Sequence, residues 1–368
     1  MKIEKFSLSI FFILLIFFSC EITQVGKEGI KEKVGKDTLI FLSPCQFDKI
    51  GKFYPCGGVQ GLFLGKNSFY ECRVLLNFPL DTSFKNSEKI KLILYPKARY
   101  FSPVKFKVYP LFLEWDENEV TWKLARANVR WINYGGDYHE VLLGEGEANE
   151  DSTIIELNSH YFDTLFKINC GIILIPQETV EKFISFYSRT EIKPPKIYFK
   201  KESRETIFYP IANAYIVDTL FEIPENYLVI GSGYSFFSYL KFDLGDLPQE
   251  ATIINADLFL YPKIDNTYFP VDTNEIVILK LIKDYSINRE NTPYEIFKRT
   301  LFFKEDSLIK IDIKNLINFW REKPDSNFGL FVSLYPFGSY PRFLLLKNQN
   351  EKIPKIEIFY FLKPKERP

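Results

Sequence analysis

The residues best suited to binding a ligand lie in one turn-rich stretch of the chain. Trp131, Tyr134 and Tyr138 offer aromatic faces on which the apolar face of a sugar ring can stack, and Asp137 and His139 can form hydrogen bonds with its hydroxyls. Because loops often carry function, this stretch is a candidate carbohydrate site. The sequence leaves the alternative open that the loop simply folds onto the protein's own core.

Three carboxylates stand slightly earlier in the chain, at Asp116, Glu117 and Glu119. Many sugar-binding sandwiches use calcium, which takes about six to eight oxygen ligands from several segments. Three neighbouring acids do not supply such a set, so a solvated turn is the better interpretation. We therefore expect no cofactor, with calcium left open but not indicated by the spacing.

The motifs of common enzymes are missing. The two histidines, His139 and His160, do not form an HExxH pattern, and the chain has neither GxSxG nor GxxxxGK[ST]. A glycosidase needs two carboxylates at a set separation, which cannot be identified among 47 acidic residues. The formal net charge of zero gives no field that would favour nucleic acid. We expect a protein that is not an enzyme and does not bind nucleic acid.

The N-terminal segment, up to Ser19, has the pattern of an export signal. Two lysines accompany the apolar run Phe6–Phe18, which is shorter than the ~20 residues of a transmembrane helix. Ser19-Cys20 then resembles a bacterial lipobox, which implies that Cys20 becomes the lipidated N-terminus. The phenylalanines before Ser19 depart from the usual lipobox, so ordinary cleavage or an uncleaved anchor stays open. Glu21, in place of the aspartate that retains lipoproteins at the inner membrane, favours the outer membrane or cell surface.

Four further cysteines follow: Cys45, Cys56, Cys72 and Cys170. In an exported protein they can be oxidised, and four thiols allow three pairings. A Cys45–Cys56 disulfide would close a small loop and is the pairing that we favour. The chain has no CxxC motif, so a zinc site is not expected.

The elements that carry these residues recur along the chain. Lys91–Lys97 (KLILYPK) and Asp257–Lys263 (DLFLYPK) are nearly the same segment, separated by almost half the chain. Cys170-Gly171 recurs in the same order as Phe328-Gly329, at a slightly smaller separation. A separation that drifts by a few positions is what insertions and deletions in loops produce. We therefore expect two copies of one β-rich domain.

Short runs of β-branched and aromatic residues, separated by turn clusters, favour an all-β fold with two tandem jelly-roll-like sandwiches. One helix is predicted over residues 312–323, where Ile313, Leu316, Ile317 and Trp320 have helical spacing. A weaker helix is expected near residues 157–165. The clearest strands are predicted at 89–95, 104–108, 154–157, 172–176, 276–282, 309–313 and 356–361.

The segment Trp115–Trp122 (WDENEVTW) resembles the W-x-E-x-x-V-T-W element of bacterial DNRLRE domains, which are exported sandwiches similar to carbohydrate-binding jelly rolls. Phe186–Arg189 resembles the F-x-S-R strand of the same domains, and Trp320 matches a tryptophan at the end of their short helix. The resemblance covers residues 38–362 as two divergent copies.

The aromatic residues of this motif differ between the copies. Tyr285 and Tyr294 stand in the second copy where the first has Trp115 and Trp122. A motif aromatic that changes type in this way favours core packing over sugar stacking. We expect these four residues and Trp320 to be structural.

These observations predict a signal peptide at 1–19, a flexible tether at 20–37, a first DNRLRE-like sandwich at 38–202 and a second at 203–363. The expected function is that of a non-catalytic cell-surface lipoprotein, anchored to the membrane by its lipid, which binds a polysaccharide or an envelope protein. A structural spacer or assembly component without a sugar site is one alternative. A polysaccharide-degrading enzyme is another.

Overall fold

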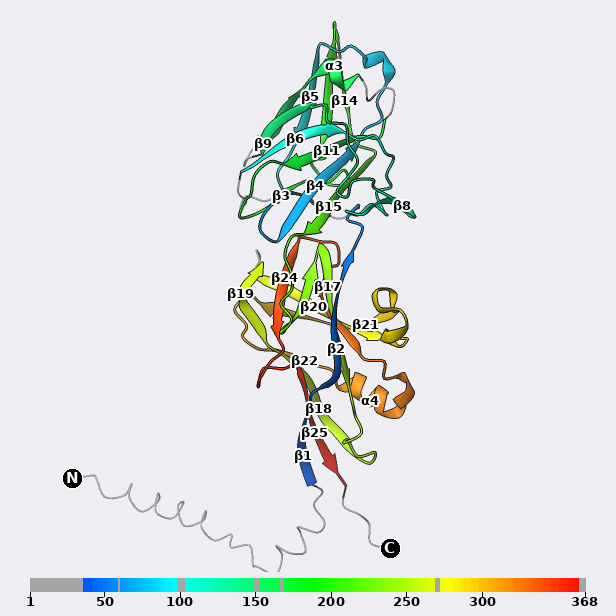
Figure 1. Ribbon diagram of the computed structural model, residues 1–368, viewed down its shortest axis with the longest axis vertical. Helices are drawn as coiled ribbons and strands as arrows, with labels where there is room; N and C mark the ends of the chain where they lie inside the picture. The colour runs from blue at the N-terminus through cyan, green and yellow to red at the C-terminus, as the bar shows by residue number, and fades with distance from the viewer. Residues whose placement is uncertain are drawn as a thin grey trace, which may run out of the picture.

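The computed structural model describes residues 36–58, 60–97, 103–148, 152–163, 165, 169–268 and 272–363. Over these residues the protein is predominantly β, with curled sheets stacked in two lobes along its long axis (Figure 1). No helix in this part of the chain is both long and apolar enough to cross a bilayer. The predicted signal peptide and Cys20 lie outside the described residues. The predicted tether ends in a strand, because Lys36 and Asp37 already belong to β1.

The first lobe comprises residues 54–219. Its elements are β3 (Leu62–Lys66), β4 (Tyr70–Asn77), η1 (Thr82–Phe84), β5 (Lys89–Leu94), β6 (Val104–Pro110), β7 (Leu124–Arg126), β8 (Val129–Arg130), β9 (Gly144–Ala148), β10 (Thr153–Leu157), α3 (Ser159–Phe162), β11 (Ile172–Pro176), β12 (Ile184–Phe186), β13 (Lys196–Lys201), β14 (Arg204–Phe208) and β15 (Ala212–Thr219). One sheet has the order β10-β5-β13-β14. The other has the order β12-β3-β4-β11-β6-β9, with β15 also paired to β4.

The second lobe comprises residues 36–53 and 220–363. Its elements are β1 (Lys36–Leu42), β2 (Pro44–Phe53), β16 (Tyr227–Ser232), β17 (Tyr234–Phe242), β18 (Thr252–Leu260), β19 (Pro262–Tyr268), β20 (Thr273–Leu281), η2 (Tyr285–Ile287), η3 (Arg289–Asn291), β21 (Tyr294–Phe303), β22 (Ile309–Asp312), α4 (Lys314–Glu322), η4 (Pro324–Ser326), β23 (Leu330–Tyr335), β24 (Arg342–Lys347) and β25 (Lys355–Leu362). Its sheets have the orders β1-β25-β18-β22, β2-β17-β23-β20-β21 and β16-β24-β19.

The two lobes share one strand order. The first lobe has one sheet with the order β14-β13-β5-β10 and a second with the order β15-β4-β11-β6-β9. In the second lobe, the order β1-β25-β18-β22 corresponds to the first of these sheets. The order β2-β17-β23-β20-β21 corresponds to the second. The registers also agree. Thr219 of β15 pairs with Tyr70, and Phe53 of β2 pairs with Tyr234. Phe53 and Thr219 therefore occupy corresponding positions, and their separation in the chain equals that of Lys91 and Asp257.

The strands do not follow the predicted domain bounds of 38–202 and 203–363. β1 and β2 precede the first lobe in the chain but pair with β25 and β17 of the second lobe, whereas β14 and β15 pair with β13 and β4 of the first. The charged stretch at 200–208, predicted to be the seam, is the β13–β14 hairpin. The charged side chains of this hairpin are exposed. A run of exposed charged residues has the same composition as a linker, which is why the sequence indicated a seam. The lobes are joined by two chain crossings, at residues 54–56 and 220–226.

The lobes also share apolar packing. The core of the first lobe extends to Val229, Phe236, Phe343 and Leu345 of the second. Tyr215 of β15 is fully buried, and its hydroxyl donates to the carbonyl of Gly338 at 2.9 Å. A separate core fills the second lobe and includes Trp320 on α4. The junction is therefore a packed interface.

All seven strands that the sequence predicts most clearly are present, as β5, β6, β10, β11, β20, β22 and β25. The predicted helices are confirmed as α4 and as the shorter α3. On α4, Leu316, Ile317 and Trp320 point into the core, which explains the helical spacing of its apolar residues.

The favoured Cys45–Cys56 disulfide is absent, and both thiols are free. An extended strand rises about 3.3 Å per residue, so β2 carries the chain roughly 26 Å from Cys45 to Phe53. The Cα atoms of a disulfide lie within about 7 Å of each other. Cys56 is buried in the first-lobe core, where burial raises the pKa of its thiol to about 12.

Two equivalent glycines are required by the fold. Gly171 and Gly329 have φ angles of 86° and 88°, and a Cβ on either would lie 2.4 Å from the carbonyl oxygen of Leu76 or 2.7 Å from that of Leu240. Alanine at either site would be held in a left-handed backbone conformation that it disfavours, and its Cβ would clash with the neighbouring carbonyl oxygen. We expect Gly171→Ala and Gly329→Ala each to lower the free energy of unfolding by about 2 kcal/mol in urea denaturation. Gly245→Ala, at an exposed turn, should stay within about 0.5 kcal/mol.

Candidate functional site

The turn-rich stretch singled out by the sequence packs against the first lobe. Trp131 is only 2% exposed, and its indole N–H donates to the carbonyl of Thr121 at 3.0 Å. Asp137 is fully buried, and its carboxylate accepts the backbone N–H groups of Ile132 and Asn133, both at 2.7 Å. Trp131 and Asp137 therefore hold the turn in place and do not face a ligand, contrary to the prediction.

The other three candidate residues lie at the surface of the same turn. Tyr134 is about half exposed. Tyr138 is half-buried against the ring of Tyr109, with centroids 5.0 Å apart, and the exposed His139 lies 5.0 Å from the ring of Phe112. These side chains pack beside neighbouring rings, and none of them lines the junction cleft described below.

The motif aromatics make packing contacts in both lobes. Trp115 donates its indole N–H to the carbonyl of Cys170 at 2.9 Å, and Trp122 is buried beneath the guanidinium of Arg73, 4.6 Å from its ring. Tyr285 stacks on Tyr239 with a centroid distance of 4.2 Å. The hydroxyl of Tyr294 lies 2.9 Å from that of Tyr54. None of these arrangements presents an open aromatic platform.

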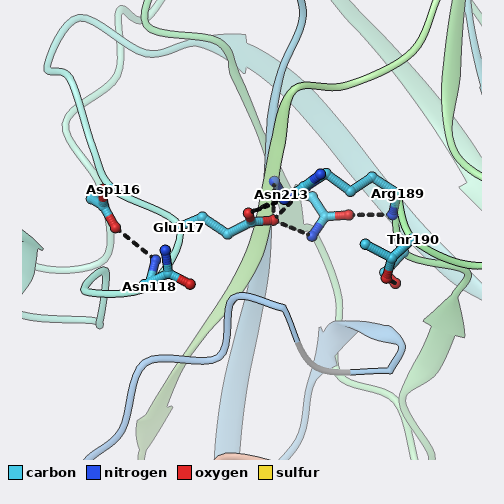
Figure 2. A network of polar contacts seen from close by, with 7 residues as sticks. Asp116, Glu117, Asn118, Arg189, Thr190 and Asn213 are labelled. Carbon is cyan, nitrogen blue, oxygen red and sulfur yellow. Dashed lines mark hydrogen bonds and ion pairs between the residues drawn. The ribbon is translucent and has the colours of Figure 1, made fainter.

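A polar network joins three distant segments of the first lobe (Figure 2). The carboxylate of Glu117, which is buried, accepts Nε of Arg189 at 2.9 Å and Nη2 at 2.7 Å. It also accepts the backbone N–H and side-chain amide of Asn213, both at 3.0 Å. The amide oxygen of Asn213 in turn accepts the backbone N–H of Arg189 at 2.5 Å. The hydrogen bond to Glu117 raises the pKa of the Arg189 guanidinium.

This network joins two segments that the sequence analysis singled out, because Glu117 lies in WDENEVTW and Arg189 in FYSR. The other two acids are used locally. Asp116 accepts the N–H of Asn118 at 2.8 Å, and Glu119 accepts that of Ala127 at 2.6 Å. In the described residues no group of three or more His, Cys, Asp or Glu side chains can hold a metal ion. The three carboxylates are structural contacts.

A cleft of about 480 Å³ opens where the two lobes meet. First-lobe residues 67–69 and 179–182 form one side, and second-lobe residues Thr267, Tyr268 and Lys304 form the other. Small-molecule sites typically have volumes of about 300–1,000 Å³. Because both lobes contribute, the cleft depends on their fixed arrangement.

Aromatic rings from both lobes meet in this cleft. Phe69 and Tyr268 lie with ring centroids 5.9 Å apart and planes inclined by 33°, and both are half-buried. The hydroxyl of Tyr268 lies 3.2 Å from that of Tyr340. The rings belong to a larger aromatic cluster, so their positions are fixed by packing.

The polar lining contains one buried amide without a full set of partners. Asn67 is 7% exposed, and its side-chain oxygen accepts the backbone N–H groups of Phe69 and Tyr70 at 2.9 and 2.8 Å. Its Nδ2 has no hydrogen-bond acceptor among the described residues. Lys182, Lys304 and Glu181 are exposed around it. An unpaired buried donor costs about 1–3 kcal/mol, and this nitrogen lies beneath the cleft surface, where a ligand does not reach it.

No family model matches this chain. Sequence reasoning missed the cleft because its lining comes from four short segments, which are far apart in the chain and carry no motif. The pattern that it found instead, at 131–139, marks residues that are aromatic and polar but mostly packed inward.

Proposed function

We propose that this chain is a non-catalytic surface protein that binds an acidic saccharide in the cleft between its lobes. The proposal treats the lobes as two copies of one jelly-roll-like, DNRLRE-like module. It also places the protein at the outer membrane or cell surface through a lipid on Cys20. The observation that carries it is the junction cleft, which combines aromatic rings from both lobes with exposed lysines and hydroxyl groups.

The composition of the lining favours an acidic sugar. Phe69 and Tyr268 provide apolar surface for a sugar ring. Two lysines and one glutamate give the lining a net positive charge, which attracts a carboxylate or another acidic substituent. Thr179, Thr267 and Ser68 add hydroxyl groups at the same place.

Affinity electrophoresis of the full chain through gels containing acidic or neutral polysaccharides tests the proposal. We expect stronger retention by an acidic polymer. Asn67→Asp keeps both acceptor contacts of the side chain but adds a negative charge to the cleft lining, so it should weaken binding of an acidic polymer at least tenfold. Ser68→Trp should have a similar effect, because it fills the cleft from an exposed position.

Tyr134→Ala and His139→Ala are the matched controls, because they remove exposed aromatic groups of the first lobe away from the cleft. Both should retain full binding. If they abolish retention while the cleft variants do not, the sugar site lies on the 131–139 turn. New reducing or unsaturated ends in the polymer after incubation would instead indicate a polysaccharide-degrading enzyme.

The second candidate function is that of a structural spacer without a sugar site. The two chain crossings and the shared core favour it, because they fix the lobes end to end. Absence of retention on every acidic and neutral polymer would support the spacer against the binding protein.

A further inference from the structure

The first two strands of the described residues complete a lobe to which they are connected only through the other lobe. β1 pairs along its whole length with β25, from Lys36 opposite Leu362 to Leu42 opposite Ile356. β2 pairs in the same way with β17. Both strands lie at the edge of their sheets. The segment 36–53 therefore adds an edge strand to each of two sheets, at the N-terminal end of the described residues.

β2 is weakly buried compared with β15, its equivalent in the first lobe. Among residues 37–53 only Leu42 is buried, and Phe41 and Phe47 are 53% and 54% exposed. In β15, which occupies the position of β2, residues 213–217 are all at most 2% exposed. Since local opening is easiest where little apolar surface is buried, β1 and β2 are the pair that can leave.

Polar contacts hold β2 in place. Asp48 accepts the hydroxyl of Tyr285 at 2.8 Å and pairs with Arg289. The ammonium group of Lys49 donates to the carbonyls of Pro224 at 2.7 Å and Tyr227 at 3.1 Å. Each of these contacts joins β2 to the second lobe alone, so the β2 strand of another copy would make the same set.

The connection to the first lobe is short. Phe53 ends β2, whereas Gly57 already bridges Ala214 and approaches Glu117 so closely that it has no room for a Cβ. Tyr54 still packs on the second lobe, against Phe237 and Phe337, so the hinge between the two attachments is Pro55-Cys56. A short hinge next to an edge strand pair is the arrangement in which copies of a chain exchange an element.

We propose that residues 36–53 of one molecule occupy the β25 and β17 edges of a second molecule's second lobe, so that two copies of this chain join by reciprocal strand exchange. Every backbone and side-chain contact between this segment and the second lobe is regained in the partner. Concentration then decides between the closed monomer and the exchanged dimer.

Paired cysteines test the exchange in the full chain, on a Cys20→Ser, Cys45→Ser background that removes Cys20 and the exposed thiol of Cys45. Phe41 and Glu357 face each other across the β1–β25 pair. One variant carries Phe41→Cys, and the other carries Glu357→Cys. After the two are mixed at high concentration and oxidised, we expect a disulfide-linked species of twice the chain mass on a non-reducing gel.

The equivalent pair in the first lobe is Ile207 and Tyr198, which face each other across β14 and β13. A mixture of Ile207→Cys and Tyr198→Cys has the same local geometry in a strand pair fixed at both ends, so it should give at least tenfold less linked dimer. This comparison measures random collision of exposed thiols.

A chain with both Phe41→Cys and Glu357→Cys should close within itself when oxidised dilute, and should then no longer exchange. If this double variant closes fully but the mixed single variants give no more dimer than the first-lobe pair, the exchange does not occur. Asp48→Asn should speed dimer formation severalfold, because it weakens the contacts with Tyr285 and Arg289.

Discussion

Replacing Trp131 with alanine should lower the free energy of unfolding by about 4 kcal/mol, because burial of a tryptophan in a core is typically worth about 3–5 kcal/mol. The side chain is 2% exposed and packs in the small cluster that also contains Trp122 and Ile173. The substitution also leaves the carbonyl of Thr121 without the indole donor. Urea denaturation followed by tryptophan fluorescence and circular dichroism measures the change.

Tyr134→Ala is the matched control for this prediction, because Tyr134 lies slightly further along the same turn and is 51% exposed. Its effect should stay within about 0.5 kcal/mol. The comparison separates a turn that is folded for stability from one that presents its aromatics to a ligand. Equal, small effects of both substitutions would contradict the structural role of Trp131.

Replacing Glu117 with alanine should destabilise the protein by about 3 kcal/mol, because removal of one partner leaves buried donors without an acceptor. The largest share of this cost comes from the two N–H donors of Asn213, which lose their acceptor. This residue is 1% exposed, so bulk water does not reach these donors. The guanidinium of Arg189 is partly accessible and can be rehydrated, which limits the loss. The midpoint of urea denaturation should fall at unchanged slope.

Glu114 offers a control on the same loop. Its carboxylate also pairs with an arginine, Arg126 at 2.9 Å, but its side chain is 74% exposed. An exposed ion pair is worth about 0–1 kcal/mol, so Glu114→Ala should change stability little. If both variants changed the free energy of unfolding equally little, the network around Glu117 would be a surface contact that does not stabilise the packing of the three segments.

The regular elements of the fold could be predicted because they depend on local periodicity. The alternation of KIKLILY matches the buried and half-buried positions of β5, and the helical spacing that ends at Trp320 matches the apolar face of α4. The repeat also identified Gly171 and Gly329 as equivalents, which share one left-handed conformation.

The partner of each strand could not be predicted in the same way. β2 pairs with β17 in the same register in which β15 pairs with β4. The sequence pattern of β1–β2 therefore fits either lobe, and so does that of β14–β15. What distinguishes them is tertiary burial, such as that of Tyr215 against the second lobe. The burial of Trp131 and the assembly of the cleft depend on the same kind of long-range contact.

The path of β1 and β2 has a mechanical consequence. In Figure 1 they rise from the free end of the second lobe, beside β25, to the junction, where the chain enters the first lobe. A pulling force applied between the N-terminal end of β1 and the first lobe would be carried by the covalent backbone of this segment. The rest of the second lobe would carry little of that force. Such a force would therefore act on residues 36–53 and would leave most hydrogen bonds of the second lobe unloaded.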